Sequence, residues 1–412
     1  MEYGLIGEKL SHSFSAQIHQ RFFGREYGLC ELTPAELPRF IELRGFKGIN
    51  VTAPYKRTVI PMLDSLSEEA RRTDAVNVII NENGVLRGYN TDVFGMRSAL
   101  LRSGFGFSGK KALVLGSGGT SGTALAVLAE LKAARILRVS RGGKEGCVTY
   151  DRVLSEFSDS EVIVNATPVG TSPDLASAAL DARLFPKLAF AFDAVYNPLR
   201  TRFCINAAEA GAFAEGGLYM LAAQAVKTES LFTGEEYGAD VTENVYKTLL
   251  REKRSVVLTG MPGAGKSTVG KLVARILSRP FYDTDLIITE KTGTPPGEII
   301  SRCGEARYRE LESEAVLSLA GVRGAVIATG GGVALDIENV RALKANGKLY
   351  FIDRPPRELA VSADRPLTPD TAALERVYGE RRESYLKNCD ERIRGGRDAS
   401  ETARKIAEEY TV

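Results

Sequence analysis

The chain has few of the residues that most often carry acid–base or metal chemistry, with two histidines and five cysteines in 412 residues. The cysteines stand far apart, without a CxxC pair or a clustered histidine. This spacing predicts neither a disulfide framework nor a zinc site, and it indicates reduced cysteines in a cytoplasmic protein. With only His12 and His19 present, proton transfer must fall largely to Lys, Asp, Glu or a bound ligand.

A strong net charge and long apolar runs are also missing. The 54 basic and 52 acidic side chains leave a net charge of +2, too little for bulk attraction to nucleic acid. No apolar run reaches the roughly 18 residues of a membrane span, and the first residues do not resemble a signal peptide. We therefore expect small-molecule partners, with neither nucleic acid nor membrane. The oligomeric state stays open.

Two glycine-rich loops, each between a buried strand and a helix, stand far apart in the chain. GSGGTSG occupies residues 116–122 after the apolar run 112–115, and GMPGAGKS occupies 260–267 after 255–259. Strand, glycine turn and helix in this order form a βα unit of a parallel sheet. The predicted fold class is therefore α/β. A helix expected over 242–254 places a domain boundary near residues 251–254.

The first loop indicates a dinucleotide site, because a helix N-terminus behind a tight glycine turn can bind a pyrophosphate. A glycine turn without a ligand is the alternative. The following strand, 136–140, ends at Arg141, where a site for NAD usually has an acidic residue. A basic residue suits the 2′-phosphate of NADP, unless Arg141 is simply a solvated loop charge.

Seven motifs occur in order around this loop: HSFS (12–15), NVTAPYK (50–56), AVN (75–77), GYNTD (88–92), NATPVG (165–170), DAVYNP (193–198) and GLYMLAAQ (217–224). Together they resemble the motifs of shikimate dehydrogenases over residues 1–250. The resemblance implies NADPH-dependent reduction of 3-dehydroshikimate to shikimate. It also implies a substrate subdomain of about 1–95 completed by helices at about 218–250, and a Rossmann NADP domain at about 96–217.

The resemblance makes Lys56 and Asp92 the catalytic pair. An ammonium beside a carboxylate can give a proton to a ketone oxygen and stabilise the charge that develops there. Taken alone, Lys56 would be an exposed loop lysine and Asp92 a helix N-cap. The residues implied for substrate binding are Ser13, Ser15, Thr52, Asn77, Tyr196 and Gln224. Those implied for NADP are Gly116, Gly118, Gly119, Thr120, Ser121, Arg141, Lys144 and Met220.

The chain departs from the family pattern after the second nucleotide-fold strand. Ser140-Arg141-Gly142 stands where the family has Asn-Arg-Thr. The segment from Arg141 to Asn165 is short, as though a crossover helix had been trimmed. A dehydrogenase with relaxed NAD use, or one that prefers quinate, therefore remains an alternative.

The second loop matches GxxxxGK[ST] at every fixed position, which is typical of a nucleoside triphosphate site. Lys266 is expected to reach the β- and γ-phosphates, and Ser267 to hold Mg²⁺. The motifs FYDTD (281–285), GEARYRELE (304–312), ATGGG (328–332) and RPL (365–367) follow in order. They resemble shikimate kinases over about 254–412, which implies transfer of the γ-phosphate of ATP to the 3-hydroxyl of shikimate.

By this resemblance Asp285 accepts the substrate hydroxyl, and Asp283 serves Mg²⁺ through water. Arg309, oriented by Glu312, and Arg381 bind the carboxylate, which a guanidinium fork matches. The Gly330–Gly332 backbone, Gly331 included, lets the substrate approach, and Arg365 neutralises the transferring phosphoryl group from a lid. The residues implied for ATP are Gly263, Ala264, Gly265, Lys266, Ser267, Thr268, Arg365 and, on the adenine side, Arg397.

The two resemblances together imply a bifunctional enzyme of chorismate and aromatic amino-acid biosynthesis, with NADP(H) and ATP–Mg²⁺ as its cofactors. A ligand-sensing regulator made of inactive copies of these enzymes is a rival from another class. Such a regulator would have lost catalytic residues, yet all of those implied here are present: Lys56, Asp92, Lys266, Asp283 and Asp285.

Overall fold

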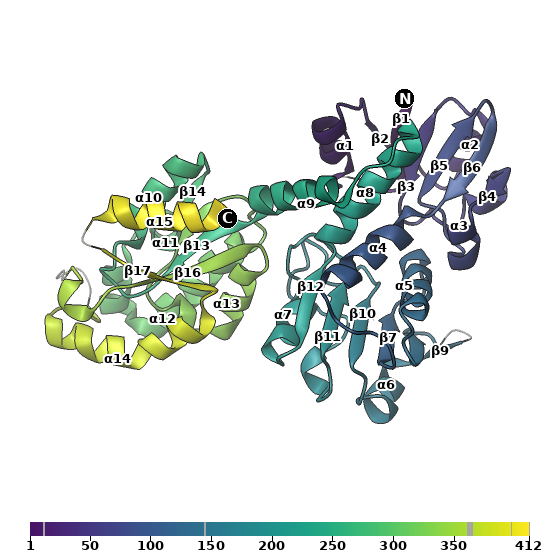
Figure 1. Ribbon diagram of the computed structural model, residues 1–412. Coiled ribbons are helices and arrows are strands. Elements are labelled where there is room, and N and C mark those ends of the chain that lie inside the picture. Colours follow the sequence, from purple (N-terminus) through teal and green to yellow (C-terminus); the bar gives the residue numbers. More distant parts are fainter. Residues whose placement is uncertain (11–12, 144–145, 361–365, 397, 412) are drawn as a thin grey trace. The chain divides into compact units, whose positions relative to one another are not determined.

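The computed structural model describes residues 1–10, 13–143, 146–360, 366–396 and 398–411. They form two compact units, Met1–Thr248 and Leu249–Val412, and the division falls inside helix α9 (Ala239–Lys253). Within the described ranges, each of the three sheets is covered by helices (Figure 1), which confirms the predicted α/β class. No helix among the described residues is long and apolar enough to cross a membrane.

The first sheet of the N-terminal unit is mixed, with the strand order β2-β1-β3-β5-β6-β4. β1 pairs in parallel with β2 and β3, whereas β5 runs antiparallel to β3 and β6. Its strands are β1 (Tyr3–Gly7), β2 (Gly28–Glu31), β3 (Gly48–Val51), β4 (Ser65–Leu66), β5 (Val78–Glu82) and β6 (Val85–Tyr89). Its helices are α1 (Ser15–Phe23), α2 (Leu37–Glu42), the 3-10 turn η1 (Ile60–Met62) and α3 (Glu68–Thr73).

The second sheet is entirely parallel in the order β12-β11-β10-β7-β8-β9, and its central strands are buried apolar runs, as expected for a sheet covered on both faces. Its strands are β7 (Lys111–Leu115), β8 (Arg135–Val139), β9 (Cys147–Val148), β10 (Val162–Asn165), β11 (Phe190–Asp193) and β12 (Phe213–Gly216). The intervening helices are α5 (Gly119–Glu130), α6 (Tyr150–Glu156), the 3-10 turn η2 (Ala182–Leu184) and α7 (Arg202–Glu209).

The register of this sheet gathers three of the predicted motifs at one edge. Leu115 lies opposite Asn165, and Asn165 lies opposite Asp193, so β7, β10 and β11 end at the same level. The loops that follow these strands therefore meet at the carboxyl edge, where ligands of open α/β sheets bind. The crossover between β8 and β10 contains the seven-residue helix α6, so a helix is present in the segment where the sequence suggested a trimmed one.

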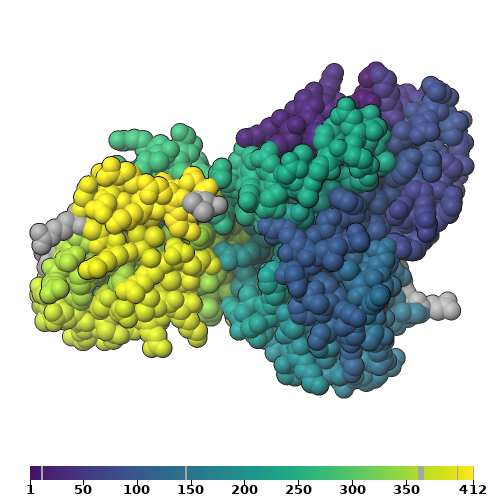
Figure 2. Space-filling view, in the orientation of Figure 1, coloured from purple at the N-terminus to yellow at the C-terminus, as the bar shows by residue number. Residues whose placement is uncertain are grey.

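Helices α4 (Thr91–Arg102) and α8 (Leu218–Thr233) run side by side between the two sheets (Figure 1). Met96 and Leu100 of α4 share a buried cluster with Met220 and Ala223 of α8. The later turns of α8 reach the first sheet's subdomain, where the buried Glu229 is 2.6 Å from Nδ1 of His19. Figure 2 shows α8 directly beside the N-terminal residues. Helix α8 therefore packs against the second sheet with its first turns and against the first sheet's subdomain with its later turns.

The C-terminal unit is a five-stranded parallel sheet in the order β14-β15-β13-β16-β17. Its strands are β13 (Ser255–Thr259), β14 (Phe281–Asp283), β15 (Val326–Ala328), β16 (Gly347–Asp353) and β17 (Glu391–Arg394). Its helices are α10 (Lys266–Leu277), α11 (Thr284–Thr292), α12 (Pro296–Leu319), α13 (Ile337–Lys344), α14 (Thr371–Asn388) and α15 (Ala399–Thr411), with 3-10 turns η3 (Val333–Leu335) and η4 (Pro356–Glu358).

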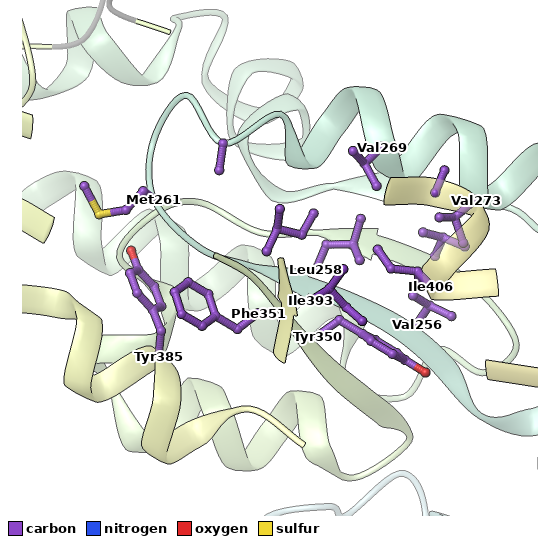
Figure 3. Packing of buried hydrophobic residues seen from close by; sticks show 14 of the residues in the cluster. Val256, Leu258, Met261, Val269, Val273, Tyr350, Phe351, Tyr385, Ile393 and Ile406 are labelled. Atoms are coloured by element: carbon purple, nitrogen blue, oxygen red, sulfur yellow. The ribbon is translucent and has the colours of Figure 1, made fainter. Parts of the chain in front are cut away.

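The core of this unit packs around β13 and β16. Figure 3 shows Val256 of β13 among side chains from α10 and α15, including Val273 and Ile406. Tyr385 of α14 stacks on Phe351 of β16, with ring centroids 5.0 Å apart. This packing fixes the start of α10 and the inner face of α14, both of which contribute to the site described below.

Partly buried Glu215, near the end of β12, lies where the second sheet meets α4 and α9. Its Oε2 has no hydrogen-bond partner among the residues that the structure describes, its Oε1 is 3.6 Å from Arg102 Nη1, and the side chain is 12% exposed. Burial raises the pKa of Glu215 to about 7, although Arg102 opposes the shift. Between pH 4.5 and 7 the folded state therefore binds more protons than the unfolded state. The free energy of unfolding falls as the pH rises through this window.

We expect Glu215→Gln, which cannot ionise, to stabilise the protein relative to the parent at pH 8 but not at pH 5. From the pKa shift, the free energy of unfolding of the variant relative to the parent should change by up to about 3 kcal/mol between the two pH values. Urea titrations followed by circular dichroism measure that difference. Glu236→Gln, at an exposed carboxylate, is the control. A difference that does not change between the two pH values would contradict the prediction.

Candidate active sites

Lys56 and Asp92 form a close ion pair at the edge of the first sheet. Lys56 Nζ lies 2.6 Å from Asp92 Oδ2, and the side chains are 19% and 8% exposed. Asp92 stands in the first turn of α4, which is capped by Asn90, whose side chain accepts the Asp92 N–H. Asn77 Nδ2 donates to the other carboxylate oxygen at 3.0 Å. Both oxygens of Asp92 are therefore held, and the ammonium has a fixed position.

The ion pair lines a cavity of about 280 Å³. The other residues that line this cavity come from both the beginning and the end of the N-terminal unit. Such a volume suits a small polar ligand. All six residues predicted for substrate binding line it, namely Ser13, Ser15, Thr52, Asn77, Tyr196 and Gln224. Met220, predicted to lie near the nicotinamide, lines the same cavity.

Asn50, which was not predicted as a site residue, also lines this cavity. Tyr27 donates to its Oδ1 at 2.8 Å, and its Nδ2 donates to the Asn77 carbonyl at 3.3 Å. Thr91 continues the buried network, because its N–H donates to Asn77 Oδ1 at 2.7 Å. Its hydroxyl lies 3.1 Å from that of Thr228 on α8. The network supports Asn77, and through it Asp92, from beneath the cavity.

A second cavity, of about 1010 Å³, lies along the carboxyl edge of the parallel sheet. Predicted cofactor residues Gly116, Gly118, Gly119, Thr120 and Arg141 line it. Five residues line this cavity and the smaller one, so the two meet beside the Lys56 side chain: Thr52, Lys56, Thr120, Ala194 and Tyr196. The N-terminus of α5 at the glycine loop offers N–H groups to an anion, and the cavity therefore fits a dinucleotide.

The loops after β10 and β11 are held to each other at this cavity. Asn165 Oδ1 accepts from the Thr167 N–H and hydroxyl at 3.0 and 2.7 Å, and Asn165 Nδ2 donates to Asp193 at 3.0 Å. Burial raises the pKa of Asp193 to about 6, opposed by hydrogen bonds from Thr201, Val195 and Asn165. These motif residues shape the cavity wall, whereas Thr167 itself lines the cavity.

One of the predicted cofactor residues, Ser121, does not line this cavity. Ser121 is fully buried, and its hydroxyl accepts from Arg138 Nε of β8 at 3.0 Å, so its side chain is bound to the sheet. Lys144 lies outside the described residues. Tyr150 and Arg57 line the cavity although the sequence motifs did not indicate them. Tyr150 is the first residue of helix α6, in the segment whose sequence departs from the family pattern.

The glycine-rich loop of the second unit runs from the end of β13 into α10. Gly265 has φ +87°, a left-handed conformation that favours glycine, and α10 begins at the next residue. Lys266 is 8% exposed, and its ammonium donates to the carbonyls of Gly260 and Met261 at 2.8 and 2.9 Å. The ammonium therefore lies over the loop, where phosphate oxygens bind in P-loop proteins.

Ser267 and Asp283 meet at the foot of this loop. Ser267 Oγ donates to Asp283 Oδ2 at 2.6 Å, and Asp283 Oδ1 accepts the Asp285 N–H that begins α11. Among the described residues there is no group of three His, Cys, Asp or Glu side chains that could hold a metal alone. Mg²⁺ commonly binds through one or two protein oxygens plus nucleotide phosphates, so this hydroxyl and carboxylate fit it.

The predicted carboxylate-binding arginines converge on the loop after β15. Arg309 Nη1 is 2.6 Å from Glu312 Oε2, and a side chain at Gly332 would collide with its guanidinium. Arg381 is 8% exposed, and its Nη1 donates to the Gly331 carbonyl at 3.2 Å. Tyr385 also donates to the Gly331 carbonyl. Both guanidinium groups also face one carboxylate oxygen, Glu305 Oε1, which is 2.6 Å from Arg309 Nη2 and 3.9 Å from Arg381 Nη2, so they are close enough together to bind one carboxylate.

Asp285 lies in a cluster with Tyr308 and Glu312, next to Arg309. Tyr308 donates to Asp285 Oδ1 at 2.9 Å. Burial raises the pKa of Asp285, and the Tyr308 hydrogen bond opposes the shift. Burial likewise raises the pKa of Glu312, opposed by Arg309. Arg365 and Arg397, predicted at the lid and the adenine, lie outside the described residues.

Comparison with known families agrees with this division. The family model "Shikimate dehydrogenase substrate binding domain" matches residues 5–79, and the family model "Shikimate kinase" matches residues 262–411. A shikimate dehydrogenase (NADP(+)) of Clostridium perfringens is 34% identical over 264 residues, which cover 60% of this chain and 97% of the relative. One from Caldanaerobacter subterraneus is 32% identical, with coverage of 58% and 93%.

Solved structures show the same likeness over the first unit. Shikimate dehydrogenase 1 of Peptoclostridium difficile is 34% identical, with a TM-score of 0.56 and coverage of 60% of this chain and 97% of that one. A Thermus thermophilus shikimate 5-dehydrogenase, solved in complex with NADP(H) and shikimate, is 31% identical, with a TM-score of 0.53 and coverage of 60% and 98%.

Fold and sites together define a dinucleotide-dependent oxidoreductase followed by a P-loop kinase. The chain belongs to the shikimate dehydrogenase family, and a shikimate kinase domain follows in the same polypeptide. Both predicted resemblances are thereby confirmed.

Proposed function

We propose that this chain catalyses two consecutive reactions of aromatic amino-acid biosynthesis, reduction of 3-dehydroshikimate to shikimate and phosphorylation of shikimate at its 3-hydroxyl. The observation that carries the proposal is the Lys56–Asp92 pair at the junction of a small polar cavity and a dinucleotide cavity. The kinase half rests on the P-loop and the two inward-facing arginines.

In the first reaction Lys56 gives the proton to the ketone oxygen, and Asp92 holds its ammonium in place. Bound NADPH supplies the hydride. Ser13, Ser15, Thr52, Asn77, Tyr196 and Gln224 bind the acid's carboxylate and hydroxyls. The ammonium, held by Asp92, stabilises the charge that develops at the oxygen.

In the second reaction Asp285 accepts the hydrogen of the acceptor hydroxyl and orients its oxygen for in-line attack. Arg309 and Arg381 bind the acceptor's carboxylate, and Lys266 neutralises phosphate charge. ATP with Mg²⁺ supplies the phosphoryl group, and Ser267 and Asp283 would hold the ion. Arg365 completes the charge stabilisation. The oxygen phosphorylated here is the one that the first reaction has converted from ketone to alcohol.

We assign the dehydrogenase reaction to residues 1–250 and the kinase reaction to residues 254–412. We propose cytoplasmic enzymes that act on small molecules and bind no nucleic acid. Steady-state assays with NADPH and NADH against shikimate and quinate, and with ATP against shikimate, test the proposal. Turnover of quinate with NAD alone would favour the relaxed dehydrogenase, and the absence of any turnover would favour the regulator.

Arg141 lines the dinucleotide cavity beside Ser140 and Tyr150, and we propose that it selects NADPH over NADH. We expect Arg141→Ala to weaken NADPH binding about tenfold or more while changing NADH binding little, since only NADPH carries the 2′-phosphate. Fluorescence titration with each reduced cofactor measures both affinities. Arg152→Ala is the control, because Arg152 is an exposed arginine paired with Glu156 on α6. Equal losses for the two cofactors would mean that Arg141 does not bind the phosphate.

A further inference from the structure

Tyr308, in the middle of the GEARYRELE motif, has no role in the reaction described above. It lies on α12 just beyond the break at Gly304, and its side chain is buried. Its Oη is 2.9 Å from Asp285 Oδ1 and 3.3 Å from Glu312 Oε1. A neutral phenol therefore lies between two carboxylates, one of them the group that receives the acceptor hydroxyl.

A phenol has a single hydrogen to donate, so it cannot serve both carboxylates equally. The shorter distance assigns this hydrogen to Asp285. Glu312 has a different donor, because Arg309 Nη1 lies 2.6 Å from its Oε2. Among the described residues, Tyr308 is the side chain that donates a hydrogen bond to the Asp285 carboxylate. The orientation of Asp285 thus depends on this phenol.

The Gly330 backbone closes the cluster from the other side. A Cβ at Gly330 would stand 2.3 Å from Glu312 Oε1, 2.9 Å from Tyr308 Oη and 3.1 Å from Asp285 Oδ1. The loop is held in this position, because the Gly330 N–H donates to Thr284 Oγ1 at 2.8 Å. The phenol and both carboxylates are therefore enclosed between α12 and the loop after β15, with little room to rotate.

We propose that Tyr308 is a positioning residue for phosphoryl transfer. Its hydroxyl holds Oδ1 of Asp285, so that Oδ2 stays free to accept the hydroxyl of a small carboxylic acid bound by the two arginines. This inference rests on the proposed role of Asp285. It predicts an effect on the chemical step rather than on substrate affinity, since Tyr308 holds a group that acts on the substrate and is not assigned a contact of its own.

The test compares Tyr308→Phe with the parent in the full chain, where the dehydrogenase rate measures the amount of folded protein. We expect the kinase kcat to fall about 10- to 100-fold, with KM for shikimate and for ATP within about twofold, because small misplacements cost that much. Incorporation of 3-fluorotyrosine at position 308 keeps the donor and should keep the parent kcat. Tyr350→Phe removes a buried hydroxyl elsewhere in the unit, away from Tyr385 in Figure 3, and should leave kcat unchanged.

Three results would overturn the inference. An unchanged kcat in Tyr308→Phe, or a raised KM alone, would show that the hydroxyl does not position the reacting group. Equal losses in the phenylalanine and fluorotyrosine proteins would assign the effect to ring packing. Asp285→Asn with the parent's kinase rate would overturn this inference and the role of Asp285 together. A parent protein without shikimate kinase activity would instead refute the proposed function, which is measured first.

Discussion

Lys56→Ala is expected to lower the dehydrogenase kcat about 10²- to 10⁴-fold, the usual contribution of a general acid or base. The ammonium lies 2.6 Å from Asp92, at the place where the two cavities of the N-terminal unit meet. Its loss removes the proton donor from the transition state, whereas the hydroxyl and amide groups that bind the substrate remain. We therefore expect substrate affinity to change only a few-fold.

Steady-state kinetics with 3-dehydroshikimate and NADPH measure this effect. The kinase activity of the same protein serves as an internal control for folding and concentration. Lys110→Ala is the matched variant, because Lys110 lies in the same unit and pairs with Glu161 at 2.8 Å, outside the residues that line either cavity. A Lys56→Ala protein with the parent's kcat would show that another group donates the proton.

Lys266→Met is expected to lower the kinase kcat by at least about 100-fold, as the loss of a charged group at a developing anion commonly does. Methionine has nearly the same length but no charge, so it fills the buried site without neutralising phosphate oxygens. The dehydrogenase rate should be unchanged. Every kinase residue assigned here lies in the C-terminal unit, and every dehydrogenase residue lies in the N-terminal one.

A coupled assay for ADP release measures the kinase rate. Lys271→Met is the control, because this exposed lysine lies on α10 as well, beyond the first turn. If Lys266→Met also lost the dehydrogenase rate while circular dichroism showed a folded protein, the two sites would not be separable.

The sequence allowed the main elements of both sites to be predicted because each motif follows a strand or opens a helix. In a parallel sheet the loops that follow the strands all leave from the same edge. Gly116, Asn165 and Asp193 therefore had to come together at that edge. Lys56 and Asp92 were predicted as a pair from motif resemblance, and they lie in contact. Their roles await the kinetic tests above.

Other features depend on side-chain directions that a motif does not contain. Ser121 was predicted to bind the cofactor, but its side chain turns toward Arg138 on the neighbouring strand. Asn50 and Thr228 come together across 178 positions of sequence. The hydrogen bond from Tyr308 to Asp285 joins two different motifs, which were treated separately. Such contacts arise from packing between elements and have no local sequence pattern.

The position of Lys56 has a consequence for the order in which ligands act on each other. Its side chain is part of the wall of both cavities, so either ligand strips water from the same ammonium when it enters. The second ligand to arrive then meets a group whose dehydration has already been completed. Cofactor and substrate should therefore promote each other's binding, and thermodynamic linkage requires the enhancement to be the same in both directions.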